Sequence, residues 1–150
     1  MKRTILILAF MGLIVTSGLS QIRTPVKWSV ASKKLNAQEA VVFVKATIQD
    51  GWHIYGLNVP TGGPESTKFT FAKSKDFSLD GKIKEPVAKS KYEDAFKVNV
   101  PFHNGEIVFQ QKVKLNSSKP STVSGSVLFS TCNKQECLPE DEYNFSVVIK

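Results

Sequence analysis

The sequence lacks the features that mark membrane-bound and nucleic-acid-binding proteins. Beyond an apolar run from Ile5 to Val15 it has no second long apolar segment, and no cysteine follows that run to accept a lipid anchor. Its lysines, including Lys89 and Lys91, are spread along the chain and do not gather with aromatic residues into one stripe, which is typical of solvated surface. We therefore expect a soluble mature protein with no membrane span after the leader and no nucleic-acid partner.

Sequence motifs of common hydrolytic and nucleotide-binding proteins are also absent. We find no Ser, His and Asp constellation, no paired-carboxylate motif and no Gly-rich phosphate loop, because Thr61-Gly62-Gly63-Pro64 is better explained as a turn between strands. No linker and no internal repeat divides the chain. Hydrolysis therefore has little support, and we predict one domain.

The amino-terminal segment has the order of an export signal. Lys2 and Arg3 precede the apolar run, and small residues follow it up to Ser20. The run is too short to span a bilayer, which takes about 20 apolar residues, so cleavage after Ser20 is predicted. This divides the chain into a signal peptide, 1–20, and a domain, 21–150. We expect the mature protein to be periplasmic or otherwise exported.

Apolar and polar residues alternate along most of the remaining chain, and this period of two is typical of half-buried strands. Helical periodicity is not sustained anywhere, so we predict an all-β protein. The expected fold is an immunoglobulin-like antiparallel β-sandwich, with a jelly roll or a barrel as alternatives. Turn signals occur at Asp50-Gly51, Thr61–Pro64, Asp80-Gly81, Asn104-Gly105 and Ser117–Pro120. The strand candidates are Val26–Val30, Ala40–Ile48, Lys68–Phe71, Phe77–Ile83, Ile107–Leu115, Val123–Ser130 and Asn144–Ile149.

The only two cysteines, Cys132 and Cys137, share one short loop near the carboxyl end. Two thiols this close can form and break a disulfide with little rearrangement, which favours redox chemistry in an exported protein. A structural bridge is the alternative. Closing a loop of about six residues removes only roughly 2 kcal/mol of unfolded-chain entropy, and a bridge between distant strands would remove more. The spacing therefore favours a redox pair over a staple.

Metal binding is a further alternative, because His53 and His103 could join the two cysteines in a Cys2His2 set. Zinc sites usually show closely spaced ligand pairs, whereas these histidines are separated by almost half the chain. His103 is better explained as a turn residue beside Asn104-Gly105. We predict no metal and no other cofactor.

Four segments that occur together and in order carry a family resemblance. They are Asp50–Tyr55, Gly63–Thr67, Tyr92–Phe96 and Cys132–Pro139, which contains the sequence Cys-Leu-Pro. From about Trp28 to Phe145 the chain resembles the amino-terminal periplasmic domain of the thiol:disulfide interchange protein DsbD. The resemblance implies an immunoglobulin-like sandwich with a reversible disulfide. Such a domain passes reducing equivalents from a thioredoxin-like domain to periplasmic oxidoreductases, an electron transfer associated with cytochrome c biogenesis.

The resemblance also implies roles for individual residues. Cys132 and Cys137 would be the redox pair, with Cys137 as the sulfur that forms the mixed disulfide with a partner. Phe96 would be a cap on a flexible loop that shields the disulfide. Without the resemblance, Phe96 and Tyr55 would be interpreted as core residues. The implied surroundings of the sulfurs are His53, Tyr55, Glu93 and Asp94.

The chain also departs from the family pattern. Its cysteines enclose four residues, one fewer than in the best-known members, and the sequence ends at Lys150 without a transmembrane region or a thioredoxin-like domain. We therefore expect a free-standing domain that receives electrons from a separate protein. Nothing in the loop strongly activates a thiolate, since Lys134 and Glu136 offset each other, so reactivity would depend on the docked partner.

These observations lead to two main hypotheses about function, beside a third in which the thiols and His53 serve a copper or zinc carrier. The first is thiol-disulfide exchange without a cofactor, of the protein-disulfide reductase kind, with thioredoxin-like redox proteins and exported disulfide oxidoreductases as partners in trans. The second is a non-enzymatic β-sandwich module that binds another exported protein and uses its disulfide as a staple. The reduction potential of the disulfide separates the two, because structural bridges usually lie below about −300 mV.

Overall fold

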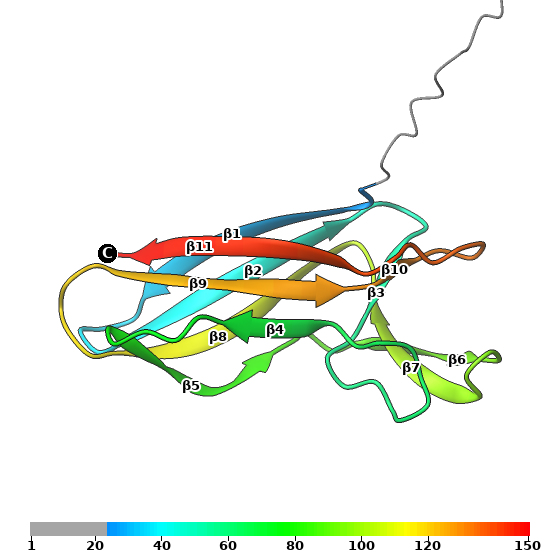
Figure 1. Cartoon of the computed structure of the whole chain (residues 1–150), viewed down its shortest axis with the longest axis horizontal. Coiled ribbons are helices and arrows are strands. Elements are labelled where there is room, and N and C mark those ends of the chain that lie inside the picture. Colours follow the sequence, from blue (N-terminus) through cyan, green and yellow to red (C-terminus); the bar gives the residue numbers. More distant parts are fainter. Residues whose placement is uncertain (1–23) are drawn as a thin grey trace, which may run out of the picture.

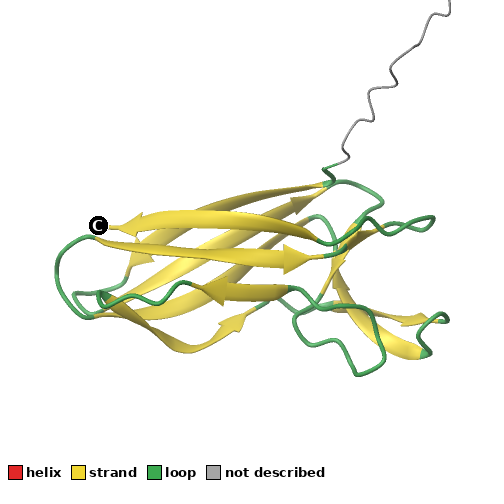
Figure 2. Cartoon of the chain, viewed as in Figure 1, coloured by secondary structure: helices red, strands yellow, loops and turns green. Residues whose placement is uncertain are grey.

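The computed structural model describes residues 24–150 of the chain. The predicted signal peptide and its cleavage after Ser20 lie outside these residues. The described part is all-β, and Figure 2 shows strands joined by loops throughout. Residues 24–150 thus contain no helix that could cross a membrane.

The strands vary from two to ten residues in length. The long ones confirm the strands that the alternating pattern predicts, and several short ones were not predicted. Their bounds are β1 Val26–Lys34, β2 Glu39–Ile48, β3 His53–Tyr55, β4 Lys68–Phe71, β5 Phe77–Lys84, β6 Lys89–Glu93, β7 Val98–His103, β8 Glu106–Leu115, β9 Ser121–Phe129, β10 Thr131–Cys132 and β11 Asp141–Ile149.

Two sheets form the body of the molecule. One has the strand order β1-β2-β8-β5 and the other β11-β9-β4, and the paired strands in both run antiparallel. Figure 1 shows the second sheet lying across the first, with β11 beside β1. This arrangement confirms the predicted immunoglobulin-like antiparallel β-sandwich.

The core lies between these two sheets, where the alternating residues of the long strands meet. In β8 the side chains of Ile107, Phe109, Val113 and Leu115 are buried, as their spacing predicts. Burying one such side chain contributes about 1.5–3 kcal/mol, and slipping a strand by one residue would turn its whole apolar set toward water. The core therefore fixes the register of the strands that lead to the smaller sheet described below.

Gln111 is the polar exception on the inner face of β8. Its side-chain amide donates hydrogen bonds to the carbonyl oxygens of Asp80, Gly81 and Lys112 at 3.4, 3.2 and 2.8 Å. The prediction that Asp80-Gly81 is a turn between strands is wrong, because both residues lie inside β5, where its register against β8 shifts. A bulge exposes backbone carbonyls, and the buried amide of Gln111 satisfies them.

A third, smaller sheet has the order β10-β3-β7-β6 and lies at the end of the sandwich away from the carboxyl terminus (Figure 1). None of its four strands is among the strands that the alternating pattern predicts, although a strand after Asp50-Gly51 was expected to carry His53 and Tyr55. Two of them, β3 and β10, have only three and two residues, and β7 contains Pro101, which disfavours an assignment as a strand. This sheet places the cysteine hairpin at one end of the molecule.

The two faces of the smaller sheet have different roles. Ile54 pairs with His103 across β3 and β7, and both are buried on the side of the main core. His103 was predicted to be a turn residue, which is wrong: it ends β7, and its Nε2 lies 2.9 Å from Glu85 Oε2. Because side chains alternate along a strand, His53 and Tyr55 on either side of Ile54 point to the opposite face. That face carries the sulfurs.

Candidate functional site

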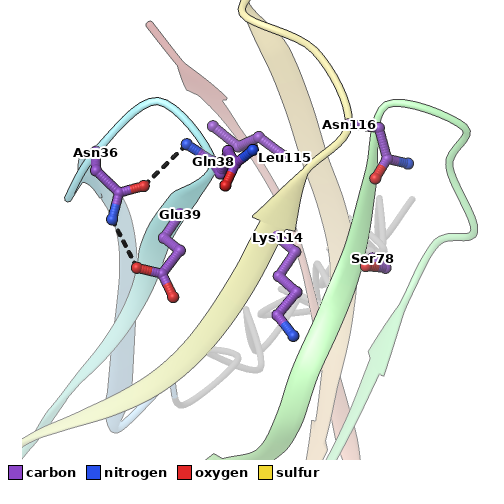
Figure 3. Close-up of a pocket in the computed structure, with 7 residues that line it drawn as sticks. All are labelled: Asn36, Gln38, Glu39, Ser78, Lys114, Leu115 and Asn116. Carbon is purple, nitrogen blue, oxygen red and sulfur yellow. Dashed lines mark hydrogen bonds between the residues drawn. The ribbon is translucent and has the colours of Figure 1, made fainter.

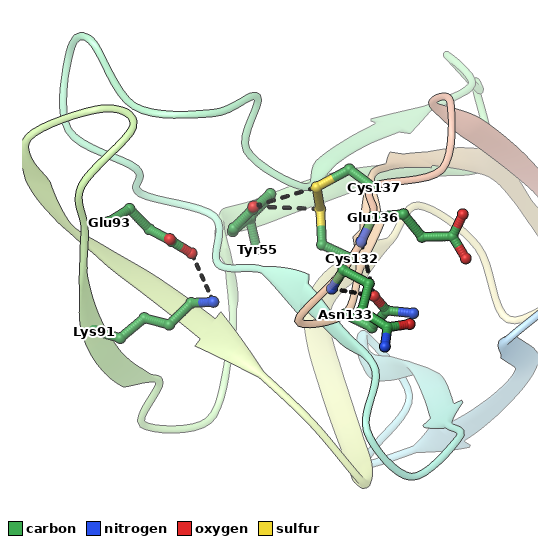
Figure 4. The surroundings of a disulfide bond; sticks show 8 residues. Tyr55, Lys91, Glu93, Cys132, Asn133, Glu136 and Cys137 are labelled. Atoms are coloured by element: carbon green, nitrogen blue, oxygen red, sulfur yellow. Dashed lines mark hydrogen bonds and ion pairs between the residues drawn. A yellow bond between two sulfur atoms is a disulfide. The ribbon is translucent and has the colours of Figure 1, made fainter.

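Cys132 and Cys137 are joined by a disulfide in a small hairpin that follows β10 (Figure 4). They face each other as an antiparallel bridge with their Cα atoms 4.0 Å apart. Asn133 tightens the turn: its N–H donates to the carbonyl of Glu136 at 2.9 Å, and its side-chain oxygen accepts from the N–H groups of Gln135 and Glu136 at 2.7 and 2.9 Å. These bonds do not involve the sulfurs, so they can hold the cysteines close together when the S–S bond opens.

The two cysteines differ in exposure. Cys132 belongs to β10 and is only 2% exposed, whereas Cys137 lies on the return arm of the hairpin and is exposed. A partner arriving from solvent can therefore reach Cys137 and not Cys132. The hairpin therefore exposes Cys137 to solvent and buries Cys132.

The hydroxyl of Tyr55 points at the disulfide, as Figure 4 shows. It lies 3.3 Å from Cys132 Sγ and 4.0 Å from Cys137 Sγ, and it is the donor, because disulfide sulfurs carry no hydrogen. Burial, with a smaller contribution from the Glu93 carboxylate, raises the pKa of Tyr55, so the hydroxyl keeps its proton at neutral pH. Thr67 holds this strand in place by donating from Oγ1 to the Tyr55 carbonyl at 2.6 Å.

His53 lies directly opposite Cys132 in the antiparallel register of β3 and β10. Its ring packs edge-on against Tyr55 and Phe102, with centroids 5.5 and 5.4 Å away. Burial lowers the pKa of His53 to about 4, helped by the nearby charge of Lys91 and opposed by that of Glu93. The imidazole is therefore neutral at neutral pH.

The hairpin between β6 and β7 faces the cysteine hairpin. Its tip is a turn over residues 94–97, closed by hydrogen bonds from the N–H groups of Phe96 and Lys97 to the Glu93 carbonyl at 3.1 and 2.7 Å. Phe96 lies in this turn, and its apolar ring is 41% exposed. Asp94 is exposed at the tip.

These elements enclose an open hollow of about 390 Å³, which we call the disulfide groove. Among the residues predicted for the site, the structure brings Phe96 and Glu93 together with His53, Tyr55 and the sulfurs, whereas Asp94 is not among the lining residues. The groove is lined by His53, Tyr55, Lys91, Glu93, Ala95, Phe96 and the six residues from Cys132 to Cys137.

Lys91 is a groove residue that sequence reasoning missed, since it was counted among the solvated lysines. It is partly buried, its Nζ lies 2.6 Å from Glu93 Oε1, and it sits over the ring of Phe102 at 5.5 Å from the centroid. Its position two residues before Glu93, on the same face of β6, is the signal that could have found it. Asn133 was also missed, although Asn is a common turn former.

The four residues of the alternative Cys2His2 set do not converge. His103 lies on the core side of the smaller sheet beside Glu85 and Phe109, while His53 lies on the side of the sulfurs. Across residues 24–150, no group of three or more His, Cys, Asp or Glu side chains is placed to hold a metal ion.

Residues 24–149 match the protein family described as "Thiol:disulfide interchange protein DsbD, N-terminal". The chain belongs to this family. Membership, together with the Cys132–Cys137 disulfide, identifies a thiol-disulfide exchange domain. No curated protein matches the chain.

Two solved structures are similar in fold. The N-terminal periplasmic domain of ScsB from Proteus mirabilis superposes with a TM-score of 0.61 at 15% identity, over 83% of this chain and 46% of the other. The DsbD n-terminal domain of Neisseria meningitidis, in the reduced form, gives a TM-score of 0.50 at 14% identity, over 78% of this chain and 82% of the other. The chain thus spans less than half the length of the ScsB chain. At these identities the likeness concerns the fold.

Proposed function

We propose that this domain relays reducing equivalents between a thioredoxin-like donor and exported acceptor proteins by opening and closing the Cys132–Cys137 disulfide. The observation that carries the proposal is the unequal exposure of the two cysteines, because Cys137 is open to a partner while Cys132 is 2% exposed. A structural bridge gains nothing from such asymmetry. A relay does, since it needs one sulfur to meet the partner and one to resolve the mixed disulfide.

The exchange proceeds by in-line attack at sulfur. A thiolate of the donor attacks Cys137 Sγ, the S–S bond breaks, and its electron pair leaves with Cys132 Sγ as a thiolate. The hydroxyl of Tyr55, 3.3 Å from Cys132 Sγ, stabilises this charge by donating a hydrogen bond to it. The second thiolate of the donor then attacks the donor sulfur of the mixed disulfide and releases Cys137. The reverse sequence passes the electrons to an acceptor.

The hairpin tip that carries Phe96 acts as a cap in this proposal. Phe96 lines the disulfide groove with the sulfurs and is still 41% exposed, so it can move away without opening the core. The ammonium of Lys91, which lines the groove, is paired with Glu93 and adds little net charge to activate a thiolate. We expect the tip to hinder the approach of small thiols to the sulfurs in this open groove until a partner displaces it.

Cysteine variants test the roles of the two sulfurs. Cys132→Ser leaves a thiol at Cys137 and should accumulate a mixed disulfide with a thioredoxin-like protein that keeps only its attacking cysteine, activated as a mixed disulfide with thionitrobenzoate. Thionitrobenzoate leaves as the thiolate, and neither protein then has a second thiol to resolve the product. Cys137→Ser should trap little, since its remaining sulfur is buried. The measurement is non-reducing electrophoresis of the purified exchange mixture. Equal trapping by the two variants would overturn the proposed roles.

Export of the protein is part of the same proposal. The order of charged, apolar and small residues before Ser20 and the periplasmic location stated for the ScsB domain support it. Amino-terminal sequencing of the protein recovered from the cell envelope should begin near Gln21. Recovery of membrane-bound protein that begins at Met1 would show a retained anchor instead.

A further inference from the structure

His53 and the buried Cys132 are neighbours on the face of the smaller sheet that carries the sulfurs. The two residues are antiparallel partners across β3 and β10, and side chains of such partners stand on the same face with Cβ atoms about 4.5–5.5 Å apart. Both residues line the disulfide groove, and they are 8% and 2% exposed. The pair therefore forms one buried unit at the floor of the groove.

The Nε2 atom of His53 is buried and has no hydrogen-bond partner among the described residues. Most buried polar atoms are paired, because an unpaired one loses its hydrogen bonds to water without replacement. The neighbours that face the ring are the aromatic rings of Tyr55 and Phe102 and the charges of Lys91 and Glu93, which pair with each other. In the disulfide form Cys132 Sγ has no hydrogen to offer.

Reduction changes the chemistry of that sulfur. Opening the S–S bond leaves Cys132 Sγ as a thiol, which can donate a hydrogen, or as a thiolate, which can accept one. We propose that Nε2 of His53 is the partner of Cys132 in the dithiol form and holds the proton that this sulfur gives up when it attacks. The proposal rests on the proposed exchange function and adds a proton acceptor to it.

In the direction that reduces an acceptor disulfide, His53 takes up and releases one proton. The Cys137 thiolate attacks the acceptor disulfide, whose S–S bond breaks and whose second sulfur leaves as a thiolate. The Cys132 thiol then passes its proton to His53 Nε2 as Cys132 Sγ attacks Cys137 Sγ. The mixed disulfide breaks, the other acceptor sulfur leaves, and the proton on His53 passes to the departing thiolate. Two electrons and the proton of Cys132 move from the domain to the acceptor, and the first acceptor thiolate takes from solvent the proton that Cys137 released when its thiolate formed.

A histidine that serves only to pack against Tyr55 and Phe102 would behave differently. Such a ring would have the same neighbours before and after reduction, because the aromatic contacts do not involve the sulfurs. A proton acceptor for Cys132 must instead gain a partner on reduction, and the negative charge of a neighbouring thiolate must favour its protonated form. The two states of the disulfide therefore distinguish the two roles.

Nuclear magnetic resonance of the imidazole nitrogens tests this in the unmodified protein. The ¹⁵N resonances of His53 are followed through a pH titration in the disulfide form and after reduction with dithiothreitol. His103, buried beside Glu85 on the other face, is the internal control. We expect the Nε2 resonance of His53 to move on reduction and its pKa to rise from about 4, while the resonances of His103 stay in place. Unchanged His53 resonances would overturn the inference.

A pair of variants provides the second measurement. In Cys137→Ser the single thiol at Cys132 is titrated by the ultraviolet absorbance of its thiolate, with and without the added change His53→Phe. A hydrogen bond to a charged group is worth about 1.5–3 kcal/mol, so the loss of His53 should raise the thiol pKa by about one to two units. His53→Gln, which can donate a hydrogen bond but cannot take a proton, should restore less than half of that shift.

The outcomes separate this inference from the proposed relay. Dithiothreitol opens the disulfide whatever the partner, so a response of His53 to reduction supports the inference even if a thioredoxin-like protein fails to react. Suppose that a thioredoxin-like protein reduces the domain, but the His53 resonances do not change on reduction and His53→Phe does not change the pKa of the Cys132 thiol. The relay would then stand and the inference would fall.

Discussion

The two ends of the sandwich both carry an open hollow, and only one of them has the means for chemistry. The hollow at the end opposite the sulfurs is the larger, about 540 Å³ against about 390 Å³ for the disulfide groove. Figure 3 shows two hydrogen bonds of Asn36 in this hollow: its Nδ2 donates to Glu39 Oε2 at 2.6 Å, and its Oδ1 accepts from the backbone N–H of Gln38 at 2.9 Å. Such contacts are usual in a solvent-exposed loop at the end of a sandwich.

The disulfide groove differs in the state of its polar groups. Tyr55 and His53 are buried with pKa values displaced by that burial, and the Tyr55 hydroxyl lies 3.3 Å from Cys132 Sγ. Displaced pKa values of this kind cluster at functional sites. The chemistry of the lining residues, and not the volume of the hollow, therefore distinguishes the candidate site on this fold.

The largest expected effect contrasts a core ring with the cap ring. Phe109→Ala removes a fully buried ring and should cost about 3–5 kcal/mol of unfolding free energy. Phe96→Ala should cost less than about 1 kcal/mol, because that ring is 41% exposed, while it should raise the rate of reaction with small thiols. Denaturant unfolding and a thiol-exchange rate, measured on both variants, check this. A severe loss of stability in Phe96→Ala would make that ring part of the core.

His53 should make the disulfide form sensitive to acid. Its folded pKa of about 4 lies below the unfolded value of about 6.5, so below pH 6.5 the unfolded chain binds more protons and stability falls until about pH 4. We expect this contribution to amount to about 2 kcal/mol, below the full value of the shift because the groove admits water. The measurement is urea unfolding at pH 7 and pH 4.

The matched control for this prediction is His53→Phe, which keeps an aromatic ring and removes the titration. The difference in stability between this variant and the unmodified protein should change with pH over the same window. A difference that is constant from pH 7 to pH 4 would show that the imidazole is not held neutral by the fold.

Tyr55→Phe removes the hydroxyl beside the sulfurs and leaves the ring. Loss of one hydrogen bond to a leaving thiolate should slow exchange about tenfold, which corresponds to about 1.4 kcal/mol. Stability of the disulfide form should change by less than about 1 kcal/mol, because a disulfide sulfur is a weak acceptor. Rates of reduction by a thioredoxin-like protein give the answer. Asn36→Ala, at the other end of the sandwich, is the control and should leave the exchange rate unchanged. If Tyr55→Phe also leaves the rate unchanged, the hydroxyl has no part in the mechanism.

The smallest effect concerns the backbone at the cap. Lys97 closes the tip with a φ of 56°, in the left-handed region that disfavours a side chain. Lys97→Gly should relieve about 1 kcal/mol of backbone strain at this position. The greater flexibility that glycine gives the unfolded chain should offset part of this gain. Thermal unfolding should show equal or slightly higher stability. A loss above about 1 kcal/mol would indicate that the Lys97 side chain makes a contact that holds the tip.

The long strands could be predicted from the sequence, because a strand that is buried on one face alternates apolar and polar residues. Ile107, Phe109, Val113 and Leu115 follow that pattern without a break, and even the polar Gln111 keeps it. The smaller sheet could not be predicted in this way, since β3 and β10 are too short to show a period and Pro101 interrupts β7. Their pairing depends on contacts between distant parts of the chain.

The candidate site likewise has residues that could be predicted from the sequence and features that could not. The two cysteines and the segment Tyr92–Phe96 were found from spacing and from a family resemblance. The exposure of Cys137, the burial of Cys132 and the orphan Nε2 of His53 follow from tertiary packing, which no local pattern encodes. His103 illustrates the opposite error, because the turn signal of Asn104-Gly105 was extended to a residue that ends a buried strand.

The reduction potential of the Cys132–Cys137 disulfide tests the central claim most directly. The protein is equilibrated against a series of glutathione and dithiothreitol buffers, and the fraction of free thiol is followed together with the fold. A relay predicts a potential within the range of thioredoxin-like and glutaredoxin-like proteins, about −270 to −120 mV, with a fold that survives reduction. A potential below about −300 mV, with marked loss of stability once the bond is opened, would contradict the account and identify the disulfide as a staple.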